Sequence, residues 1–451
     1  MTLAERTRRW STTRRRAQWC SAAVVAAVGA RAEGPATAPG RAEQWYAQGR
    51  DALYRGEYEK AADLLRKAAA EDPAKSSYRV HLARALQYTD KRAEAEQVLA
   101  EVLKAAPDHV EAGQLLGDIY FRQEKWRQVV ETLEPLLRYR HDYTTHHLLA
   151  EARFALGEME SARRDYETAV QLNPQAAGDF YQLGNIYLGS NLFAMAAEAY
   201  EKAIDLGVST PILHYKLAST YFNLRNYFGA ISTAHVKGGR PLSVHEQWYL
   251  IEPVPGREDH FRVAPSRSAV YHLARAMEGG LGERTDTQLL RANIYLNAGR
   301  YEQAYAMFKD LEAKMPRDEQ ALFHYYFAQA AFGAGRYDEY LATLKKAIEL
   351  DPKTYGPTLV DAYVKVAEHY NSLGRLDKYV ELLGLAVERS PQTASLHLRL
   401  GDALAESGRF VEAAAQCRMT LDLEPDHPRR MDLLNRITRH SGQSGEAKAR
   451  P

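Results

Sequence analysis

Apolar residues follow a helical spacing in short segments along most of the chain, and a proline closes many of these segments. The prolines that follow such segments are Pro73, Pro107, Pro174, Pro316, Pro352, Pro391 and Pro425. Successive members of this series are separated by 34 and 67 residues in the first half of the chain, and by 36, 39 and 34 residues in the second half. Because 67 is about twice 34, the pattern predicts a structural unit of about 34 residues that recurs along the chain.

A glycine divides each unit into two apolar segments. In the second half this glycine is followed each time by arginine, at Gly299, Gly335, Gly374 and Gly408. Gly56 and Gly157 have the same role in the first half, and Asp90 and Asn191 stand in equivalent positions. Glycine adopts the left-handed conformation that ends a helix at little cost, and Asp and Asn tolerate it better than other residues. Each unit is therefore predicted to be a helix, a tight turn and a second helix.

The repeat resembles the tetratricopeptide repeat family, whose 34-residue pattern combines an aromatic residue and Leu-Gly in the first helix, Ala and Phe in the second, and a closing Pro. The matching residues include Trp45, Gly49, Ala61, Leu65 and Pro73 in the first unit, Leu116, Gly117 and Tyr120 in the third, Leu183, Gly184, Tyr187, Ala196, Tyr200 and Ala203 in the fifth, Tyr295, Ala304, Phe308 and Pro316 after a break, and Leu400, Gly401, Ala413 and Pro425 in the last. The resemblance implies an all-α fold, a superhelical solenoid of antiparallel helix pairs whose first helices line a concave surface.

Two blocks of repeats are expected. Residues 42–237 are assigned to an N-terminal block of about six repeats and residues 285–427 to a C-terminal block of about four. Tyr340 and Tyr379 stand where a small Ala is usual, so we expect looser or shifted packing there. A helix over 428–440 is expected to cap the open end of the stack. The tail 441–451 is expected to be disordered.

The segment 238–284 interrupts the period. Pro253, Pro255 and Pro265 lack an amide donor, so this segment cannot continue the helical stack. Trp248 to Ile251 and Phe261 to Val263 flank a Pro/Gly turn and are expected to pair as a hairpin. Ser268 is expected to cap one further helix. The insertion is predicted to pack on a repeat helix, either at the concave side or at the joint between the blocks. The alternative is a spacer without a ligand role.

The N-terminus has the pattern of a targeting segment. Residues 1–32 combine an arginine-rich leader, a weakly apolar run from Trp19 to Gly29, and the small-x-small site Ala30-Arg31-Ala32, as in a secretory signal peptide. The run is too short to span a membrane. Residues 33–41 have the composition of a flexible linker. We expect an exported protein, periplasmic or secreted, with a mitochondrial presequence as the alternative and the choice between the Sec and twin-arginine routes open.

Composition narrows the function. The chain has 451 residues, with 59 basic and 58 acidic side chains and no long basic block, which argues against a nucleic-acid partner. Its two cysteines, Cys20 and Cys417, are too few for a disulfide framework. No catalytic motif is present, so we expect neither an enzyme nor a cofactor. Four histidines gather at His235, His245, His260 and His272, but they lack metal-ligand spacing, and no metal site is predicted.

The residues expected to face the concave surface come from the first helix of each unit. They are Tyr46, Arg50, Tyr88, Phe121, His147, Phe154, Tyr181, Asn185, Tyr215, Phe222, Asn293, Asn297, Tyr325, Gln329 and Phe332. One interpretation is a groove that stacks on and hydrogen-bonds an extended peptide or helix. The other is that the aromatic rings pack between neighbouring first helices. The resemblance places Asn185 and Asn293 where the family often has a backbone-binding Asn. Tyr181 and Tyr215 stand in place of a Lys, which argues against a C-terminal carboxylate ligand.

These observations lead to one main functional hypothesis and two alternatives. The main hypothesis is an exported, non-catalytic scaffold that binds a partner protein or peptide in its groove, in envelope assembly, secretion or polysaccharide export. The first alternative is an accessory subunit that presents a substrate or a glycan to a partner enzyme. The second is a structural protein that associates with itself.

Overall fold

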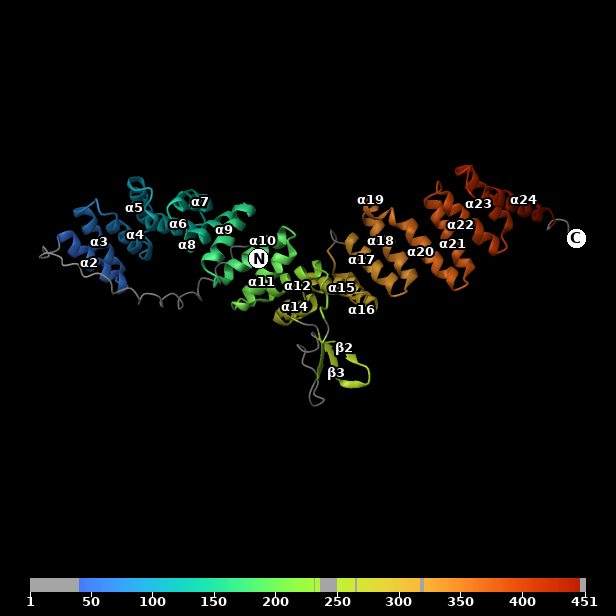
Figure 1. Cartoon of the computed structure of the whole chain (residues 1–451), viewed down its shortest axis with the longest axis horizontal. Coiled ribbons are helices and arrows are strands. Elements are labelled where there is room, and N and C mark those ends of the chain that lie inside the picture. The colour runs from blue at the N-terminus through green and yellow to red at the C-terminus, as the bar shows by residue number, and fades with distance from the viewer. Residues whose placement is uncertain (1–39, 231, 236–249, 264–265, 317–319, 447–451) are drawn as a thin grey trace. The chain divides into compact units, whose positions relative to one another are not determined.

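The predicted all-α solenoid is confirmed. The computed structural model describes residues 40–230, 232–235, 250–263, 266–316 and 320–446. Over these ranges the chain forms consecutive pairs of helices (Figure 1). They belong to two compact units, one ending at His141 and the other beginning at Asp142. The predicted signal peptide and nearly all of the predicted linker lie outside the described residues.

From Gly40 onward, where its description begins, the first unit contains three helix pairs. They are α2 (Arg41–Tyr54) with α3 (Tyr58–Glu71), α4 (Ser76–Tyr88) with α5 (Arg92–Ala105), and α6 (Val110–Arg122) with α7 (Trp126–Leu133), which the 3-10 helix η2 (Glu134–Arg138) follows. The core of this unit lies between the helices of the first two pairs and α6, where Leu65, Leu86 and Leu99 are fully buried.

The second unit contains seven helix pairs among its described residues. They are α8 (Tyr143–Ala155) with α9 (Met159–Leu172), α10 (Ala177–Gly189) with α11 (Phe193–Asp205), α12 (Pro211–Asn223) with α14 (Ala269–Ala276), α15 (Thr285–Asn297) with α16 (Tyr301–Leu311), α17 (Gln320–Gly333) with α18 (Tyr337–Leu350), α20 (Thr358–Ser372) with α21 (Leu376–Arg389), and α22 (Ala394–Glu406) with α23 (Phe410–Leu423). Shorter elements are η4 (Met277–Leu281), η5 (Glu312–Lys314) and α19 (Pro352–Tyr355), and α24 (Arg430–Glu446) comes last. None of the helices within the described ranges combines the length and apolar character needed to cross a membrane.

The turns between paired helices use the left-handed conformation, as the sequence predicts. Gly56 and Gly157 have φ of 77° and 80°, and Asp90 and Asn191 have φ of 60° and 58°. In the turn after α10 the backbone N–H of Leu192 donates to the carbonyl of Tyr187 at 2.8 Å, which closes the helix end.

Small residues in the first helices let the paired helices approach closely. A Cβ built on Gly184 of α10 would lie 2.5 Å from the ring of Tyr200 on α11. That distance is shorter than real carbon contacts, so only glycine fits opposite this ring. Tyr200 is fully buried there. Its ring packs against Gly184, as expected for a repeat in which a small residue on one helix faces a large residue on the other.

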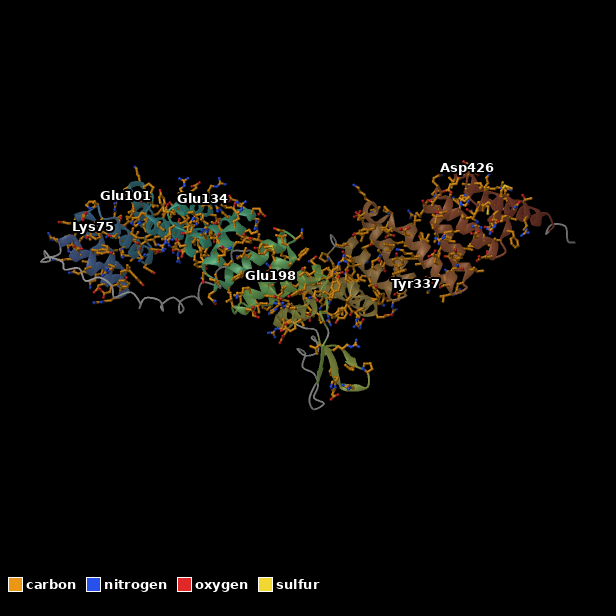
Figure 2. The ribbon with its side chains drawn as sticks, in the orientation of Figure 1. Lys75, Glu101, Glu134, Glu198, Tyr337 and Asp426 are labelled. Carbon is orange, nitrogen blue, oxygen red and sulfur yellow. The ribbon has the colours of Figure 1, made fainter. Side chains whose placement is uncertain are left out.

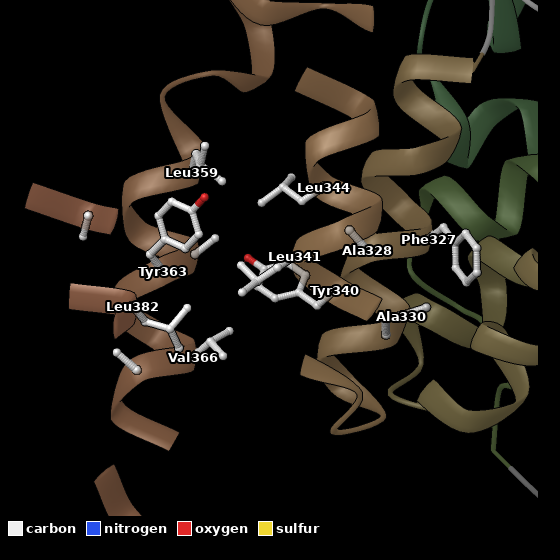
Figure 3. Packing of buried hydrophobic residues seen from close by; sticks show 14 of the residues in the cluster. Phe327, Ala328, Ala330, Tyr340, Leu341, Leu344, Leu359, Tyr363, Val366 and Leu382 are labelled. Carbon is white, nitrogen blue, oxygen red and sulfur yellow. The ribbon is translucent and has the colours of Figure 1, made fainter. Parts of the chain in front are cut away.

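The buried aromatic residues of the C-terminal pairs fill space that was expected from the sequence to be loosely packed. Tyr340 of α18 is 5% exposed, and its ring centroid lies 5.0 Å from that of Phe332. Figure 3 shows Tyr340 and Leu341 facing Tyr363 and Val366 of α20. Tyr340 is therefore buried among its neighbours, which contradicts loose packing at this position, while the alternative of shifted packing stays a prediction. Charged side chains such as Glu101, Glu198 and Asp426 instead project to solvent (Figure 2).

The insertion is a small sheet that leaves the solenoid within the sixth helix pair (Figure 1). Strands β1 (Ser232–His235), β2 (Leu250–Val254) and β3 (Arg257–Val263) pair antiparallel in the order β1-β3-β2. The predicted hairpin is present as β2 and β3, which turn at Gly256 with φ of 73°. Pro253 stands on β2, an edge strand, where a missing amide donor is tolerated. Trp248 and Tyr249 lie outside the described residues, and β1 was not expected.

The helix predicted after the hairpin belongs to a repeat. Ser268 caps α14, since its Oγ accepts from the backbone N–H of Tyr271 at 3.3 Å. α14 packs against α12, so these two elements form one pair with the sheet inserted in their turn. The boundaries proposed at 237/238 and 284/285 stay predictions.

The last helix runs further than expected. α24 packs on α23, buries Leu433 and pairs Arg436 with Asp402 of α22. It extends to Glu446, so the expectation of disorder from residue 441 is wrong for 441–446.

Candidate binding surface on the first helices

All the predicted binding residues stand on the first helices of their pairs, from α2 to α17. Arg50 and Asn297 are exposed, and Tyr88 is 60% exposed at the end of α4, where its ring stacks on Tyr58 at 4.5 Å. The others are half-buried. They are Tyr46, Phe121, His147, Phe154, Tyr181, Asn185, Tyr215, Phe222, Asn293, Tyr325, Gln329 and Phe332. The aromatic members of this set thus pack partly on their neighbours and partly face solvent. Their role in binding stays a prediction.

In the first unit, packing between neighbouring first helices dominates around Tyr46. Its ring lies 4.6 Å from Tyr78 of α4, and its hydroxyl lies 3.4 Å from Nδ1 of His81. Burial raises the pKa of Tyr46, so the hydroxyl keeps its proton at neutral pH. Arg50 remains exposed above the same ring, with its guanidinium carbon 5.9 Å from the centroid.

Helices α10 and α12 of the second unit form a denser polar cluster around Asn185. The Oδ1 of Asn185 accepts from Lys216 Nζ at 2.5 Å and from the buried Tyr200 hydroxyl at 2.9 Å. Its Nδ2 donates to Gln182 at 2.8 Å. Lys216 Nζ also lies 5.1 Å from the ring centroid of Tyr181, within the range of a cation–π contact.

Lys216 belongs to this cluster but was not among the residues predicted from the sequence. It follows Tyr215 directly, one position beyond the slot where the family has a cationic residue. Because successive helical residues differ by about 100° in direction, Lys216 and Tyr215 point to different sides of α12. A search of neighbouring positions on the next first helix could have found it. The cluster offers an ammonium group, a side-chain amide and the half-buried ring of Tyr181, a set suited to a peptide backbone or a carboxylate.

The C-terminal candidates are more engaged in packing. Tyr325 stacks on Tyr355 at 5.0 Å, and Phe332 lies edge-on to Tyr337 at 5.5 Å. Asn297 donates to the backbone carbonyl of Asn293, within its own helix. The side-chain Oδ1 of Asn293 is buried and has no hydrogen-bond partner in the described part of the chain. Asn293 therefore differs from Asn185, whose oxygen is satisfied twice.

Neighbouring histidines on α8 point in two directions, as their adjacent positions on a helix predict. His146 Nδ1 lies 3.1 Å from Asp165 of α9, which also accepts from Arg153 at 2.5 Å. His147 Nδ1 lies 2.8 Å from Oδ1 of Asp179 on α10. Glu151 of α8 lies near His147 and Asp179. One potential ligand atom from each of these three residues falls within 4.8 Å of the others.

A second histidine contact joins the two helices that flank the insertion. His214 of α12 and His272 of α14 are buried, with their Nδ1 atoms 2.9 Å apart. Burial lowers the pKa of His214 to about 4, helped by Arg275. Burial, then the neighbouring His214, lowers the pKa of His272 to about 3. Both imidazoles are therefore neutral at pH 7, and one donates to the other. His272 belongs to the histidine group noted in the sequence, and its role here is to pack.

A shallow pocket of about 550 Å³ opens where the inserted sheet leaves the sixth pair. Its lining includes Arg225, Arg267 and Phe228, with Phe228 edge-on to Tyr295 at 5.5 Å. Arg267 is paired with Glu201 at 3.0 Å. The lining of the pocket therefore includes an aromatic ring and two guanidinium groups, one of which is paired with Glu201.

Comparison with known families matches most of the repeat blocks. Three profiles, each described as tetratricopeptide repeat, match residues 52–115 and 90–152, residues 143–175, and residues 181–234, 289–354 and 361–428. Together these matches cover more than half of the chain.

Two curated relatives illustrate how far sequence similarity extends. The human protein O-mannosyl-transferase TMTC1 is 26% identical over 170 residues, which are 36% of this chain and 19% of the relative. The mouse tetratricopeptide repeat protein 21A is 20% identical over 305 residues, 59% of this chain and 21% of the relative. The chain thus spans about a fifth of the length of these relatives.

Solved structures with a similar arrangement of helices share little sequence. MamA from Desulfovibrio magneticus RS-1 is 22% identical, with a TM-score of 0.35 over 37% of this chain and 96% of that structure. YrrB, described as a TPR protein with an unusual peptide-binding site, is 19% identical, with a TM-score of 0.35 over 51% of this chain and 93% of that structure.

Proposed function

Since the chain belongs to the tetratricopeptide repeat family, we propose that it is a non-catalytic scaffold that binds an extended segment of a partner protein on its first helices. The observation that carries this proposal is the cluster on α10 and α12, formed by Tyr181, Asn185 and Lys216.

Some donors of this half-buried cluster have no hydrogen-bond acceptor among the residues that the structure describes. Lys216 carries three N–H donors, and one of them is directed to Asn185. The Asn185 amide has two N–H donors, and one of them is directed to Gln182. An extended peptide presents a row of backbone carbonyls, which accept such bonds, while the ring of Tyr181 would contact its side chains. A carboxylate is the other kind of acceptor that this surface favours, because the ammonium group of Lys216 is positively charged.

The contacts of Asn185 decide which substitutions can test the site. Replacing Asn185 with Ala would leave the buried hydroxyl of Tyr200 without its acceptor, so any loss of binding would be mixed with a loss of stability. Lys216→Met and Tyr181→Ala avoid this problem, because Met keeps the length of the lysine stem and Tyr181 is only half-buried. Lys202→Met is a matched control, since Lys202 is an exposed lysine on the second helix α11.

The experiment is quantitative capture of partners from a cell-envelope fraction by the chain carrying each substitution. We expect Lys216→Met and Tyr181→Ala to lower capture of the same partner at least about tenfold, as the truncation of anchor residues commonly does. Lys202→Met should capture it as the unmodified chain does. Equal capture by all variants, with unchanged thermal unfolding, would contradict binding at this cluster.

We also propose export to the envelope, where the scaffold would serve assembly, secretion or polysaccharide export. Support comes from the arginine-rich leader, the apolar run and the Ala30-Arg31-Ala32 site. N-terminal sequencing of the protein from its native compartment should then begin at Glu33 or within a few residues. An intact arginine-rich N-terminus would exclude this proposal.

An accessory role beside an enzyme is the second candidate. The relative that favours it is the O-mannosyl-transferase, whose activity belongs to that longer protein. This role predicts that enzymatic activity is captured together with the partner. The scaffold hypothesis by itself predicts no such activity.

A further inference from the structure

Helices α8 and α10 bring three metal-type ligands together. His147 and Glu151 are four residues apart on α8, so they lie on the same face of the helix. Asp179 stands in the first turn of α10 and faces them. One ligand atom from each of the three lies within 4.8 Å of the other two. Two ligands of a tetrahedral zinc ion, each about 2.1 Å from the metal, are roughly 3.4 Å apart, so small side-chain movements would suffice.

Asp179 carries the second, independent observation. The residue is 1% exposed, and its Oδ2 is buried without a hydrogen-bond partner in the described part of the chain. Its other oxygen, Oδ1, is 2.8 Å from His147 Nδ1. A buried polar atom without a partner costs about 1–3 kcal/mol, and more if it is charged. The helix dipole favours an acidic residue in the first turn of α10. It does not, however, supply a hydrogen-bond donor to Oδ2 of Asp179.

A simple ion pair does not account for the whole group. Protonated His147 would neutralise one carboxylate, and Asp179 already contacts it. Glu151 would then bring a second negative charge within 4.8 Å of the same pair. A divalent cation balances two carboxylates and leaves the imidazole neutral, which is the form that binds a metal.

We propose that His147, Glu151 and Asp179 form a binding site for a divalent transition-metal ion, with Zn²⁺ as the expected occupant. Imidazole and carboxylate ligands suit zinc, whereas magnesium and calcium prefer oxygen ligands alone. Three protein ligands leave a fourth position for water. His147 and Glu151 are half-buried, so solvent reaches the group and an ion can enter.

The surroundings hold the ligands in place. The buried hydroxyl of Tyr166 on α9 donates to Glu151 Oε1 at 2.7 Å. Such a hydrogen bond from a neighbouring side chain orients a metal-binding carboxylate. Tyr143 stacks on the imidazole of His147, with ring centroids 5.5 Å apart. The site thus draws on three helices of the fourth and fifth pairs, and it is separate from the Asn185 cluster.

The test uses the full chain, stripped of metal by a chelator that is then removed. Titration with Zn²⁺ is followed by calorimetry, and titration with Co²⁺ by its visible absorption. We expect one equivalent of each ion to bind, with a rise in the melting temperature. Glu151→Gln keeps an acceptor for Tyr166 and leaves the contact between His147 and Asp179 intact, and Asp179→Asn keeps the shape of the side chain. Each should weaken Zn²⁺ binding at least about tenfold, because even changes in supporting residues cost that much.

His81→Gln is the control, since His81 is a half-buried first-helix histidine that contacts Tyr46 and the backbone of Ser77. It should bind Zn²⁺ as the unmodified chain does. The proposal is overturned if the stripped chain binds no Zn²⁺, or if Glu151→Gln and Asp179→Asn bind it unchanged. Should a variant fail to fold, the Co²⁺ spectrum of the unmodified chain decides. Intense tetrahedral absorption bands support the site, and a weak spectrum like that of the aqueous ion overturns it.

Discussion

The fifth and sixth helix pairs start their turns in the same way and close them differently. After α10, Asn191 has φ of 58° and the N–H of Leu192 donates to Tyr187. After α12, Arg225 also has φ of 58° and the N–H of Asn226 donates to Tyr221 at 2.9 Å. The fifth pair continues directly into α11, whereas the sixth inserts the three-stranded sheet before α14.

The sixth pair tolerates the insertion because hydrogen bonds hold the two ends of the insertion next to each other. Asn226 Nδ2 donates to the carbonyl of Arg267 at 2.7 Å, and the N–H of Ala269 donates to the carbonyl of Asn226 at 3.0 Å. The N–H of Val270 reaches the carbonyl of Tyr227 at 3.0 Å. The chain therefore returns beside its point of departure, and the entropic cost of a longer loop grows only slowly. The end of the first helix sets the turn, and the length of the connection after it is free to vary.

The two pairs also differ in the contacts that join their helices. Gly184 and Tyr200 interlock in the fifth pair, while His214 and His272 meet in the sixth. An apolar contact is insensitive to pH, but a contact between two neutral imidazoles is not. Substitutions and pH changes can therefore distinguish the contributions of the two pairs to stability. The largest loss of stability is expected from a substitution in the fifth pair.

Tyr200→Ala should destabilise the fifth pair most. Tyr200 is fully buried, and its removal leaves a cavity opposite Gly184, so we expect a loss of about 3–5 kcal/mol. Urea unfolding measures it, with Tyr54→Ala, which removes a ring that is 70% exposed, as the control. If the two substitutions cost the same, the interlocking of Gly184 and Tyr200 does not stabilise the fold.

Acidification should weaken the sixth pair selectively. An unfolded histidine has a pKa near 6.5, whereas the pKa values of His214 and His272 are about 4 and about 3 in the folded chain. As the pH falls from 6.5 towards 4, the unfolded state therefore takes up protons that the folded state refuses. Stability is present above pH 6.5 and is lost at roughly 1.4 kcal/mol per pH unit for each histidine, down to about pH 4 for His214 and about pH 3 for His272.

The charged groups that act on this pair are Arg275, which disfavours protonation, and Glu278, which favours it at His214. Ser209 Oγ lies 2.9 Å from Nε2 of His214, and the ring of Tyr221 stacks on His272. Unfolding of the unmodified chain and of His214→Phe with His272→Phe, each at pH 7 and pH 5, measures the effect. The double variant should lose less stability at pH 5, and an identical loss in both chains would show that the pair does not cause it.

The smallest effect concerns the shared start of the two turns. Arg225→Gly should stabilise the chain by about 1 kcal/mol, because a left-handed conformation costs an ordinary residue about that much. Asn191→Gly should gain only a few tenths, since Asn tolerates this conformation. Thermal unfolding of both variants provides the measurement. Equal gains would mean that side-chain contacts of Arg225 offset the strain of its backbone.

Most of the local structure could be predicted from the sequence. The 34-residue period, the left-handed Asp90 and Asn191, the hairpin turn at Gly256 and the cap at Ser268 all appear as expected. Each depends on residues a few positions apart, whose conformational preferences hold in any context. Arg225 and Glu124 take the same left-handed turn position without a favourable side chain, so only the surrounding helices impose it.

The candidate sites were predicted in part. The candidate residues stand on first helices, as expected, but the sequence made no prediction of which side chains each of them contacts. Their role in binding stays a prediction. Lys216 reaches Asn185 from a helix 31 residues further on, and Asp179 reaches His147 across 32 residues. Both separations are close to one repeat, so neighbouring first helices bring these residues together. The direction of each side chain around its helix decides which of them meet.

The sequence by itself determined the class of fold, because the spacing of apolar residues, glycines and prolines acts through local energetics and repeats along the chain. Only the tertiary structure decided that α14 completes the pair begun by α12, and that His214 meets His272 across 58 residues. It also decided which carboxylates lie beside His147. These outcomes depend on packing between helices that are distant in sequence, and packing selects partners by shape and burial rather than by residue type.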